Sequence, residues 1–237
     1  MSALTRWMDR AWYPEHTKNW DDALFREEVL RHLGPEVTLL DLGAGAGIVS
    51  QMNFRGRARR VCGVDLDPRV VDNPFLDEGK VSDAGGIPYP DGAFDVVISD
   101  NVLEHLDAPA DVFREVARVL RPGGVFLFKT PNKWHYMPTI ARMTPHGFHQ
   151  FVNRIRGRAH VDTFPTRYRA NTRSSVLSLA EQTGFAVVFV RRIEGRPEYL
   201  RMTAPTYIAG MLYERVVNVT EALAPFRVLL VGALRKK

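Results

Sequence analysis

Cysteine is almost absent from this sequence. Cys62 is the single one in 237 residues, so no internal disulfide can form, and its apolar neighbours indicate a small buried hydrophobe. Long apolar runs are missing as well, because residues 202–213, the longest uncharged stretch near the C-terminus, are shorter than the roughly 18–20 residues of a membrane span. Residues 1–20 are polar and lack the apolar centre of a signal peptide. We therefore expect a cytoplasmic protein without a transmembrane segment. We expect its helical stretch within residues 205–224 to pack on the sheet, and the alternative is a helix that lies on the inner face of the membrane.

Two glycine-rich nucleotide fingerprints are also missing. A dinucleotide fingerprint G-x-G-x-x-G beginning at Gly43 or Gly45 needs glycine at position 48 or 50, but the sequence has Ile48 and Ser50. The phosphate loop G-x-x-x-x-G-K-[ST] occurs nowhere in the chain. The first absence disfavours a nicotinamide dehydrogenase, and the second disfavours a phosphate-loop enzyme.

The charge pattern excludes fewer classes of function than these missing motifs do. The formal net charge is +5, and arginines gather at residues 55–60 and 154–173. Such clusters suit either a solvated surface or an acidic partner, for example a phosphate-bearing substrate or an anionic membrane. No basic motif with interleaved aromatics appears, so we expect no nucleic-acid partner. The pair His146 and His149 is too small for a zinc site, which needs at least three protein ligands, so we expect no metal.

The most informative stretch runs from residue 37 to residue 50. Residues 37–42 are almost all apolar, which is typical of a buried parallel strand. Gly43, Gly45 and Gly47 follow at alternate positions, and a turn without Cβ atoms lets a ligand touch the backbone. Apolar residues from about Ile48 predict a short helix whose N-terminal amides point into the crevice.

Further apolar runs predict the rest of an α/β sheet. We expect strands at residues 61–65, 80–84, 94–99, 125–130, 186–190 and 227–234, and helices at residues 21–33, 111–120, 172–184 and within 205–224. Residues 131–173 are long, irregular and rich in aromatics, histidine and arginine, which favours a substrate lid over a disordered linker. Residues 1–19 form an aromatic arm that packs on the domain or closes over the ligand.

Four separately placed motifs carry a family resemblance over residues 39–131. The first is D-x-G-x-G-x-G, which begins at Asp41, and the others lie within P-Y-P-D-G-A-F-D-V-V-I-S-D-N-V-L-E-H-L and R-E-V-A-R-V-L-R-P-G-G. Together they resemble the class I S-adenosylmethionine-dependent methyltransferases, in the small-molecule (type 11-like) branch. The resemblance implies a doubly wound, mostly parallel, seven-stranded Rossmann-like sheet with lid insertions.

This resemblance implies one methyltransferase domain over residues 1–237. Within it we expect the aromatic arm and a helix at residues 1–36, a cofactor-binding core at 37–130, and substrate or lid insertions at 131–173 and 193–226.

The resemblance also implies S-adenosyl-L-methionine as cofactor and S-adenosyl-L-homocysteine as product. Ligands of such sheets lie beyond the carboxyl ends of the strands, near the switch point where the first strand lies beside the fourth. We expect Asp65, 18 residues beyond Gly47, to bind the ribose hydroxyls and Asp83 to bind the adenine amino group. The full set of expected cofactor-binding residues is Asp41, Gly43, Ala44, Gly45, Gly47, Asp65, Leu66, Asp83, Ala84, Ser99, Asp100 and Asn101.

Methyl transfer from a sulfonium is an in-line displacement, so the protein's main task is to align acceptor and methyl group. A hydroxyl acceptor also needs a general base, and His105, His135 and His149 are the candidates, although His105 can equally be structural. We expect a small-molecule acceptor, phosphorylated or lipid-linked, and O-methylation of a sugar, glycolipid or other secondary metabolite. The alternatives are C-methylation of a quinone-like ring and a non-catalytic S-adenosylmethionine-binding module.

Overall fold

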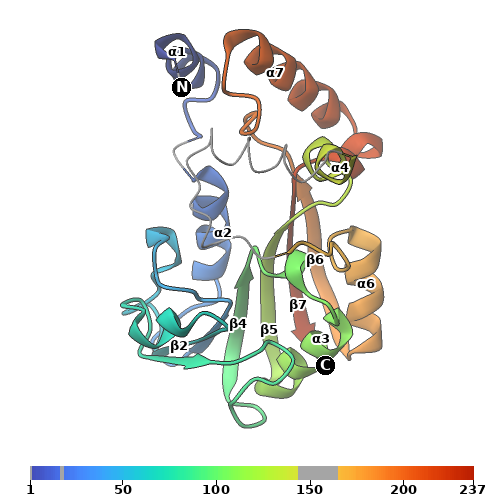
Figure 1. Cartoon of the computed structure of the whole chain (residues 1–237). Helices are drawn as coiled ribbons and strands as arrows, with labels where there is room; N and C mark the ends of the chain where they lie inside the picture. The colour runs from blue at the N-terminus through green and yellow to red at the C-terminus, as the bar shows by residue number, and fades with distance from the viewer. Residues whose placement is uncertain (1, 17–18, 144–164) are drawn as a thin grey trace.

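The computed structural model describes residues 2–16, 19–143 and 165–237, and its centre is a seven-stranded sheet flanked by helices (Figure 1). The strands are β1 (Thr38–Leu42), β2 (Arg60–Asp65), β3 (Glu78–Val81), β4 (Phe94–Asp100), β5 (Leu120–Pro131), β6 (Phe185–Ile193) and β7 (Leu229–Lys236). The helices of the described residues are α1 (Ala3–Trp12), α2 (Trp20–Leu30), α3 (Pro109–Val119), α4 (Tyr136–Met143), α6 (Arg173–Gln182) and α7 (Ala204–Val219), with short 3₁₀ turns between them.

The strand order β3-β2-β1-β4-β5-β7-β6 confirms the doubly wound sheet predicted from the sequence. β3, β2, β1, β4 and β5 pair in parallel, whereas β7 is antiparallel to both of its neighbours, β5 and β6. The first strand lies beside the fourth, as predicted, and the chain order reverses between them. Ligands of open α/β sheets bind outside the carboxyl ends of the strands at such a switch point.

Strand alternation supplies two hydrophobic cores, one on each face of the sheet. On one face Leu40 and Phe126 pack with residues of α3 and α6. On the other face Leu39 and Leu127 pack with Phe25 of α2. Because side chains alternate with period 2, polar residues at the strand ends are also sorted onto these two faces.

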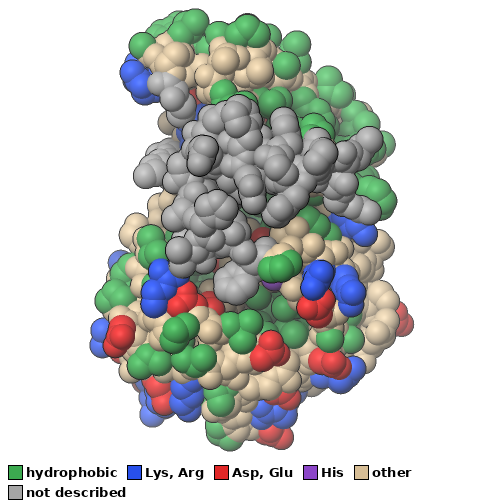
Figure 2. All heavy atoms as spheres, viewed as in Figure 1, with side chains coloured by type: hydrophobic (Ala, Val, Ile, Leu, Met, Phe, Trp, Pro, Cys, Tyr) green, Lys and Arg blue, Asp and Glu red, His purple; other side chains and the backbone are tan. Residues whose placement is uncertain are grey.

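A separate layer of helices lies above the sheet in the view of Figure 1. There α1 packs against α7 through Met8, Tyr13 and Tyr207, so the aromatic arm takes the first of its two predicted positions, packing on the domain. In the same view, hydrophobic side chains gather along the top edge over α1 and α7 (Figure 2). Within the part of the chain that the structure describes, no helix is long and apolar enough to cross a membrane.

The predicted helix from Ile48 is wrong, since only a 3₁₀ turn, Ser50–Met52, forms there. The guanidinium of Arg26, on α2, donates to the carbonyl oxygens of Gln51 (2.5 Å) and Asn53 (2.7 Å). In a longer α-helix these carbonyl groups would point along the helix axis. Here they accept hydrogen bonds from Arg26 of α2, which favours an early end of the helical segment.

The third strand ends earlier than predicted. β3 stops at Val81 instead of residue 84, because Asp83 organises a turn: its Oδ1 accepts from the Gly85 amide at 2.7 Å, and its carbonyl accepts from the Gly86 amide at 3.1 Å. Asp83 and Ala84 therefore lie beyond the sheet. Residues 144–164, which form much of the predicted lid and include His149, lie outside the described residues.

Candidate functional site

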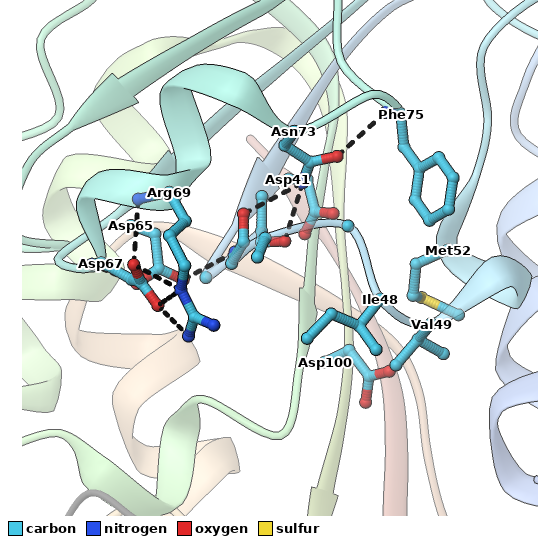
Figure 3. A pocket seen from close by; sticks show the side chains of 15 residues that line it. Asp41, Ile48, Val49, Met52, Asp65, Asp67, Arg69, Asn73, Phe75 and Asp100 are labelled. Atoms are coloured by element: carbon cyan, nitrogen blue, oxygen red, sulfur yellow. Dashed lines mark hydrogen bonds and ion pairs between the residues drawn. The ribbon is translucent and has the colours of Figure 1, made fainter. Parts of the chain in front are cut away.

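Three carboxylates meet at the carboxyl end of the sheet because of the strand alternation. Asp41 on β1, Asp65 at the end of β2 and Asp100 at the end of β4 all belong to the face covered by α2, and all line one cleft (Figure 3). Ser99, one residue before Asp100, belongs to the opposite face by the same alternation.

The glycine turn after β1 forms one wall of this cleft. Gly43, Gly45 and Gly47 have φ angles of 87°, 53° and 69°, in the left-handed region that favours glycine. The amides of Gly43 and Ala44 donate to the carbonyl oxygen of Val64, at 2.8 and 3.2 Å. The turn is thus anchored to β2, the neighbouring strand.

Asp65 strengthens this link with its side chain. Its Oδ2 accepts from the Gly45 amide at 2.8 Å, and its Oδ1 accepts from the Asp67 amide at 2.8 Å. A carboxylate offers about four lone-pair sites, so two remain for a ligand. A Cβ added at Gly45 would meet only the Asp65 carboxylate, at 3.9 Å, which means that the backbone here is open to the cleft.

Asn73, which the sequence analysis did not single out, holds the turn from another side. Its Nδ2 donates to the carbonyl oxygens of Ala44 (3.0 Å) and Gly45 (3.1 Å), and its Oδ1 accepts from the Phe75 amide at 2.9 Å. A Cβ at Gly47 would lie 2.3 Å from Asn73 Oδ1, so this packing requires glycine. These contacts join residues 28 and 29 positions apart, and no local pattern marks them.

Burial raises the pKa of two of the three carboxyls. Desolvation, helped by the charges of Asp100 and Asp65, raises the pKa of Asp41 to about 8. Desolvation also raises the pKa of Asp100 to about 7, although the nearby Lys129 opposes this shift. Both groups are therefore partly protonated near neutral pH, and a cation in the cleft would favour their ionised forms.

Lys129, on β5, is fully buried and supports Asp100. Its Nζ lies 3.0 Å from Asp100 Oδ1 and 3.0 Å from Asp21 Oδ2, and it also pairs with Asp22. Burial favours the neutral amine, but the three carboxylates outweigh it and raise the pKa of Lys129 above its ordinary value. Because Asp21 and Asp22 begin α2, the cluster joins α2 to β5 directly beside the cleft.

The cleft contains part of the predicted cofactor-binding set and several residues that were not predicted. Predicted residues in the lining are Asp41, Gly43, Ala44, Gly45, Gly47, Asp65 and Asp100. Lining residues that the sequence analysis did not assign are Ala46, Ile48, Val49, Met52, Asp67, Arg69, Asn73 and Phe75. The predicted residues Leu66, Asp83, Ala84, Ser99 and Asn101 do not belong to the lining.

A polar network occupies the opposite face of the sheet, after β4. Thr130 Oγ1 donates to Glu104 Oε2 at 2.9 Å and accepts from Asn171 Nδ2 at 2.6 Å. Desolvation raises the pKa of Glu104 to about 7. The next residue, His105, places its Nδ1 3.0 Å from the Pro165 carbonyl oxygen, so this histidine connects the segment after β4 to the loop before α6.

His135 lies in the upper layer and outside the cleft. Its ring, 1% exposed, packs near Tyr136 and Tyr213, with centroids 4.1 and 5.7 Å away. Its Nδ1 accepts from the Met137 amide at 3.4 Å, and its Nε2 lies 3.8 Å from Glu194 Oε2. Burial lowers the pKa of His135 to about 3 and raises that of Glu194 to about 8. Both side chains are therefore mainly neutral at pH 7, and His135 is a weak proton acceptor.

Among the described residues, no group of three or more His, Cys, Asp or Glu side chains is placed to hold a metal ion.

Comparisons with known sequences match part of the chain. Residues 40–128 match the family model described as "Methyltransferase domain". A "Probable S-adenosylmethionine-dependent methyltransferase" of Mycolicibacterium smegmatis is 35% identical over 138 residues, which cover 56% of this chain and 50% of the relative. The ubiquinone biosynthesis O-methyltransferase of Burkholderia multivorans is 33% identical over 134 residues, covering 49% of this chain and 57% of the relative. The chain thus spans about half the length of these curated relatives.

Two solved structures share the fold. The geranyl diphosphate C-methyltransferase of Streptomyces coelicolor A3(2), crystallised with Mg²⁺, geranyl diphosphate and S-adenosyl-L-homocysteine, gives a TM-score of 0.58 at 19% identity over 92% of this chain and 79% of its own. The [4+2]-cyclase SpnF gives a TM-score of 0.59 at 19% identity over 95% of this chain and 86% of its own. At these identities the likeness shows the fold alone. The family match contains the glycine turn and the strands on both sides of the switch point, so this part of the chain is similar to the S-adenosylmethionine-dependent methyltransferases in sequence and in fold.

Proposed function

We propose that the cleft at the β1/β4 switch point binds S-adenosyl-L-methionine and that the protein transfers a methyl group from it to a small molecule. The observation that carries this proposal is the placement of Asp65. Its carboxylate joins the glycine turn to the segment after β2, because it accepts from the Gly45 and Asp67 amides, and it keeps two lone-pair sites for a ligand. Ribose offers two adjacent hydroxyl donors, and the open backbone at Gly45 lets such a ligand approach closely.

The charges of the cleft suit a cationic cofactor. Asp41 and Asp100 supply carboxylates, whereas the cation Arg69 pairs with Asp67, its Nε 2.8 Å from Oδ2. When bound, S-adenosylmethionine supplies a methyl group activated by a positively charged sulfonium. Asp41 and Asp100 would hold the positive groups of the ligand and lose their protons in response, because an adjacent opposite charge favours the ionised carboxylate.

Apolar side chains at the cleft also favour an adenosyl ligand. Ile48 is 72% exposed although it lines the cleft, and Val49, Met52 and Phe75 lie in the same lining. An apolar side chain that stands open beside a polar site gains free energy when a ligand covers it. We assign this wall to the aromatic base and carbon skeleton of the cofactor.

We propose oxygen as the acceptor atom, on a sugar, a glycolipid or another secondary metabolite. Relatives named as O-methyltransferases support this choice: the ubiquinone biosynthesis enzyme above, and the malonyl-[acyl-carrier protein] O-methyltransferase of Serratia marcescens, 39% identical over 101 residues that cover 40% of this chain and 39% of the relative. His105 is our candidate general base, because it follows β4 closely, whereas the pKa of about 3 disfavours His135. C-methylation of a quinone-like ring is the alternative within the same family. A non-catalytic module is the alternative outside it, since this fold also occurs in a cyclase.

Labelled methyl transfer tests the proposal. The purified chain is incubated with methyl-labelled S-adenosylmethionine and a cell extract, which is then separated into lipid, polysaccharide, protein and small-molecule fractions. We expect label in the lipid or small-molecule fraction with the wild-type chain and little with Asp65→Ala. Cofactor binding without label in any fraction would favour the non-catalytic module, and label confined to protein would contradict a small-molecule acceptor.

A further inference from the structure

The layer formed by α1 and α7 turns its acidic side chains inward. The Tyr13 hydroxyl donates to Glu214 Oε2 at 2.9 Å, and the Tyr207 hydroxyl donates to Asp9 Oδ1 at 2.9 Å. Asp9 also receives Arg201, whose Nε lies 3.1 Å from Oδ1. The hydrogen-bonding groups of the two helices therefore satisfy one another between the helices instead of facing solvent.

The outer side of α7 is apolar. Ile208, Leu212, Val216 and Val219 recur every three or four residues and are 42%, 57%, 54% and 74% exposed. This spacing places them on one side of the helix. A surface helix of a water-facing domain normally buries its aliphatic stripe, so the amphipathic pattern of α7 is inverted.

α1 extends the same apolar surface. Leu4 and Trp7 are 52% and 53% exposed, and the Trp7 ring lies 6.2 Å from that of Trp12, which in turn lies 5.9 Å from Tyr207 of α7. The top edge of the molecule in Figure 2 accordingly carries hydrophobic side chains over both helices. Contiguous apolar surface of this kind marks an interaction site.

The exposed charges on these two helices have one sign. Among the charged residues of α1 and α7, the exposed ones are Arg6, Arg10 and Arg215, whereas both carboxylates, Asp9 and Glu214, take part in the inward bonds described above. A surface of aliphatic and tryptophan side chains bordered by arginine complements an anionic lipid bilayer. Arg215 also pairs with Glu214, its Nε 3.4 Å from Oε2, and two copies of this surface face to face would instead bring groups of like charge together.

We infer that the outer surface of α1 and α7 docks on anionic lipid membranes. We call it the α1–α7 surface, made of Leu4, Trp7, Trp12, Ile208, Leu212, Val216 and Val219 with Arg6, Arg10 and Arg215. The aliphatic side chains enter the boundary between headgroups and acyl chains, the tryptophans lie at the headgroup level, and the arginines pair with lipid phosphates. None of these side chains lines the switch-point cleft. The inference does not depend on the proposed methyl transfer.

Vesicle co-sedimentation of the full chain tests this inference. The vesicles contain phosphatidylcholine alone or phosphatidylcholine with an equal part of phosphatidylglycerol. We expect the chain to pellet with the anionic vesicles and much less with the neutral ones. Leu212→Glu/Val216→Glu should lower the partition coefficient at least tenfold, since two aliphatic contacts are lost. Arg10→Gln/Arg215→Gln should lower it about fivefold for each arginine on anionic vesicles only, and reduce its salt dependence.

The matched control is Val187→Glu/Val188→Glu, which charges two exposed valines of β6, away from the α1–α7 surface, and should leave the partition unchanged. Thermal melting and S-adenosylhomocysteine titration of every variant separate loss of folding or cofactor binding from loss of docking. Equal pelleting of the Leu212→Glu/Val216→Glu variant and the wild type would overturn the inference. The inference would also be overturned if the wild type forms a dimer and binds no vesicles, and the Leu212→Glu/Val216→Glu variant is monomeric. That result would assign the surface to a second copy of the chain.

Discussion

At the scale of single residues, Asp41 lowers the stability of the ligand-free protein and is proposed to bind the cofactor. Its pKa is raised from 3.8 to about 8 in the folded chain, so between about pH 4 and pH 8 the unfolded state loses a proton that the native state keeps. Stability therefore falls as pH rises through this window. A role in binding accounts for a carboxyl group that lowers stability here, because its negative charge would attract a cationic ligand in the cleft.

Asp41→Asn should stabilise the ligand-free protein at pH 8 by on the order of 3 kcal/mol and have little effect at pH 4. It should also weaken S-adenosylmethionine binding at pH 8 more than at pH 6. Urea unfolding and calorimetric titration at both pH values measure the two effects. Asp72→Asn, at an exposed aspartate of the 3₁₀ turn Pro68–Asp72, is the control and should change neither. Parallel stability profiles of wild type and Asp41→Asn would contradict the assigned pKa.

Gly47 and Gly56 provide a matched pair of glycines with positive φ, 69° and 75°. A Cβ at Gly47 would lie 2.3 Å from Asn73 Oδ1, whereas a Cβ at Gly56 would meet nothing within 4 Å. Gly56→Ala should cost about 1 kcal/mol from the left-handed backbone alone. Gly47→Ala should cost about 1–3 kcal/mol more, because Asn73 must move and release the turn. Chemical unfolding measures the free energy of unfolding of both variants. Equal losses of stability would show that Asn73 can move aside without weakening the turn.

How far the sequence predicted the site depends on the range of each contact. Asp41, the glycines and Asp65 are separated by short stretches whose strand–turn–strand order fixes their meeting, and all of them line the cleft. Asn73 reaches the turn from a position 28 residues later, through a loop whose path no local pattern specifies. Ser99 was expected at the cofactor from the sheet topology and the family resemblance; alternation along β4 puts it on the other face from Asp100, and its role stays a prediction.

At the scale of elements, the buried ion cluster joins α2 to the sheet. Lys129 has no exposed surface and pairs with Asp21, Asp22 and Asp100. Lys129→Met should cost roughly 3–5 kcal/mol at pH 7, because it leaves carboxylates buried without a cation. The cost should shrink as the pH falls below about 7, because Asp100, whose pKa is about 7, then takes up a proton.

Lys80→Met is the control for this prediction. Lys80 pairs with Glu78 at 3.4 Å in a partly exposed position, so its loss should cost less than about 1 kcal/mol. Chemical denaturation at pH 7 and pH 5 compares the two variants. If Lys129→Met costs no more than Lys80→Met at pH 7, then the cluster does not hold α2 against β5.

The strands were easier to predict than the helices that follow the cofactor turn. Except for β3 (E-G-K-V), each strand contains an apolar run, so its existence followed from the sequence, while its ends shifted by a few residues. The stretch from Ile48 has apolar residues with helical spacing, yet Arg26 of α2 takes the carbonyls of Gln51 and Asn53. This tertiary contact, about 25 residues away in sequence, overrides local preference. Helix α1 carries one local signal, Ser2, whose side chain accepts from the Thr5 amide.

At the scale of the whole molecule, the sheet and the α1/α7 layer are separate bodies of packing. The doubly wound, mostly parallel, seven-stranded sheet was predicted through the resemblance that the motifs carry, whereas the antiparallel β7 was not. The pairing of α1 with α7 brings together segments that are far apart in the sequence. The Tyr13–Glu214 and Tyr207–Asp9 hydrogen bonds join residues 201 and 198 positions apart. No periodicity within either segment predicts such a meeting.

Asp9→Asn tests whether these bonds hold α1 in place. It weakens the contacts to Arg201 and Tyr207 while leaving the sheet untouched. We expect faster hydrogen exchange in α1 and altered fluorescence of Trp7 and Trp12, with the exchange of β1 and β4 amides unchanged. Equal protection of α1 in both proteins would mean that the packing of Met8 and Tyr13 alone is sufficient.

The most direct test of the central claim is calorimetric titration of S-adenosyl-L-homocysteine into the wild-type chain, Asp65→Ala and the control Asp72→Ala. Asp65 holds the glycine turn through the Gly45 amide and is proposed to bind the ribose, so its loss should weaken binding at least tenfold, while circular dichroism shows a folded protein. Asp72→Ala should bind like the wild type. Equal affinity of Asp65→Ala and the wild type, or no binding by any of the three, would contradict the assignment of this cleft.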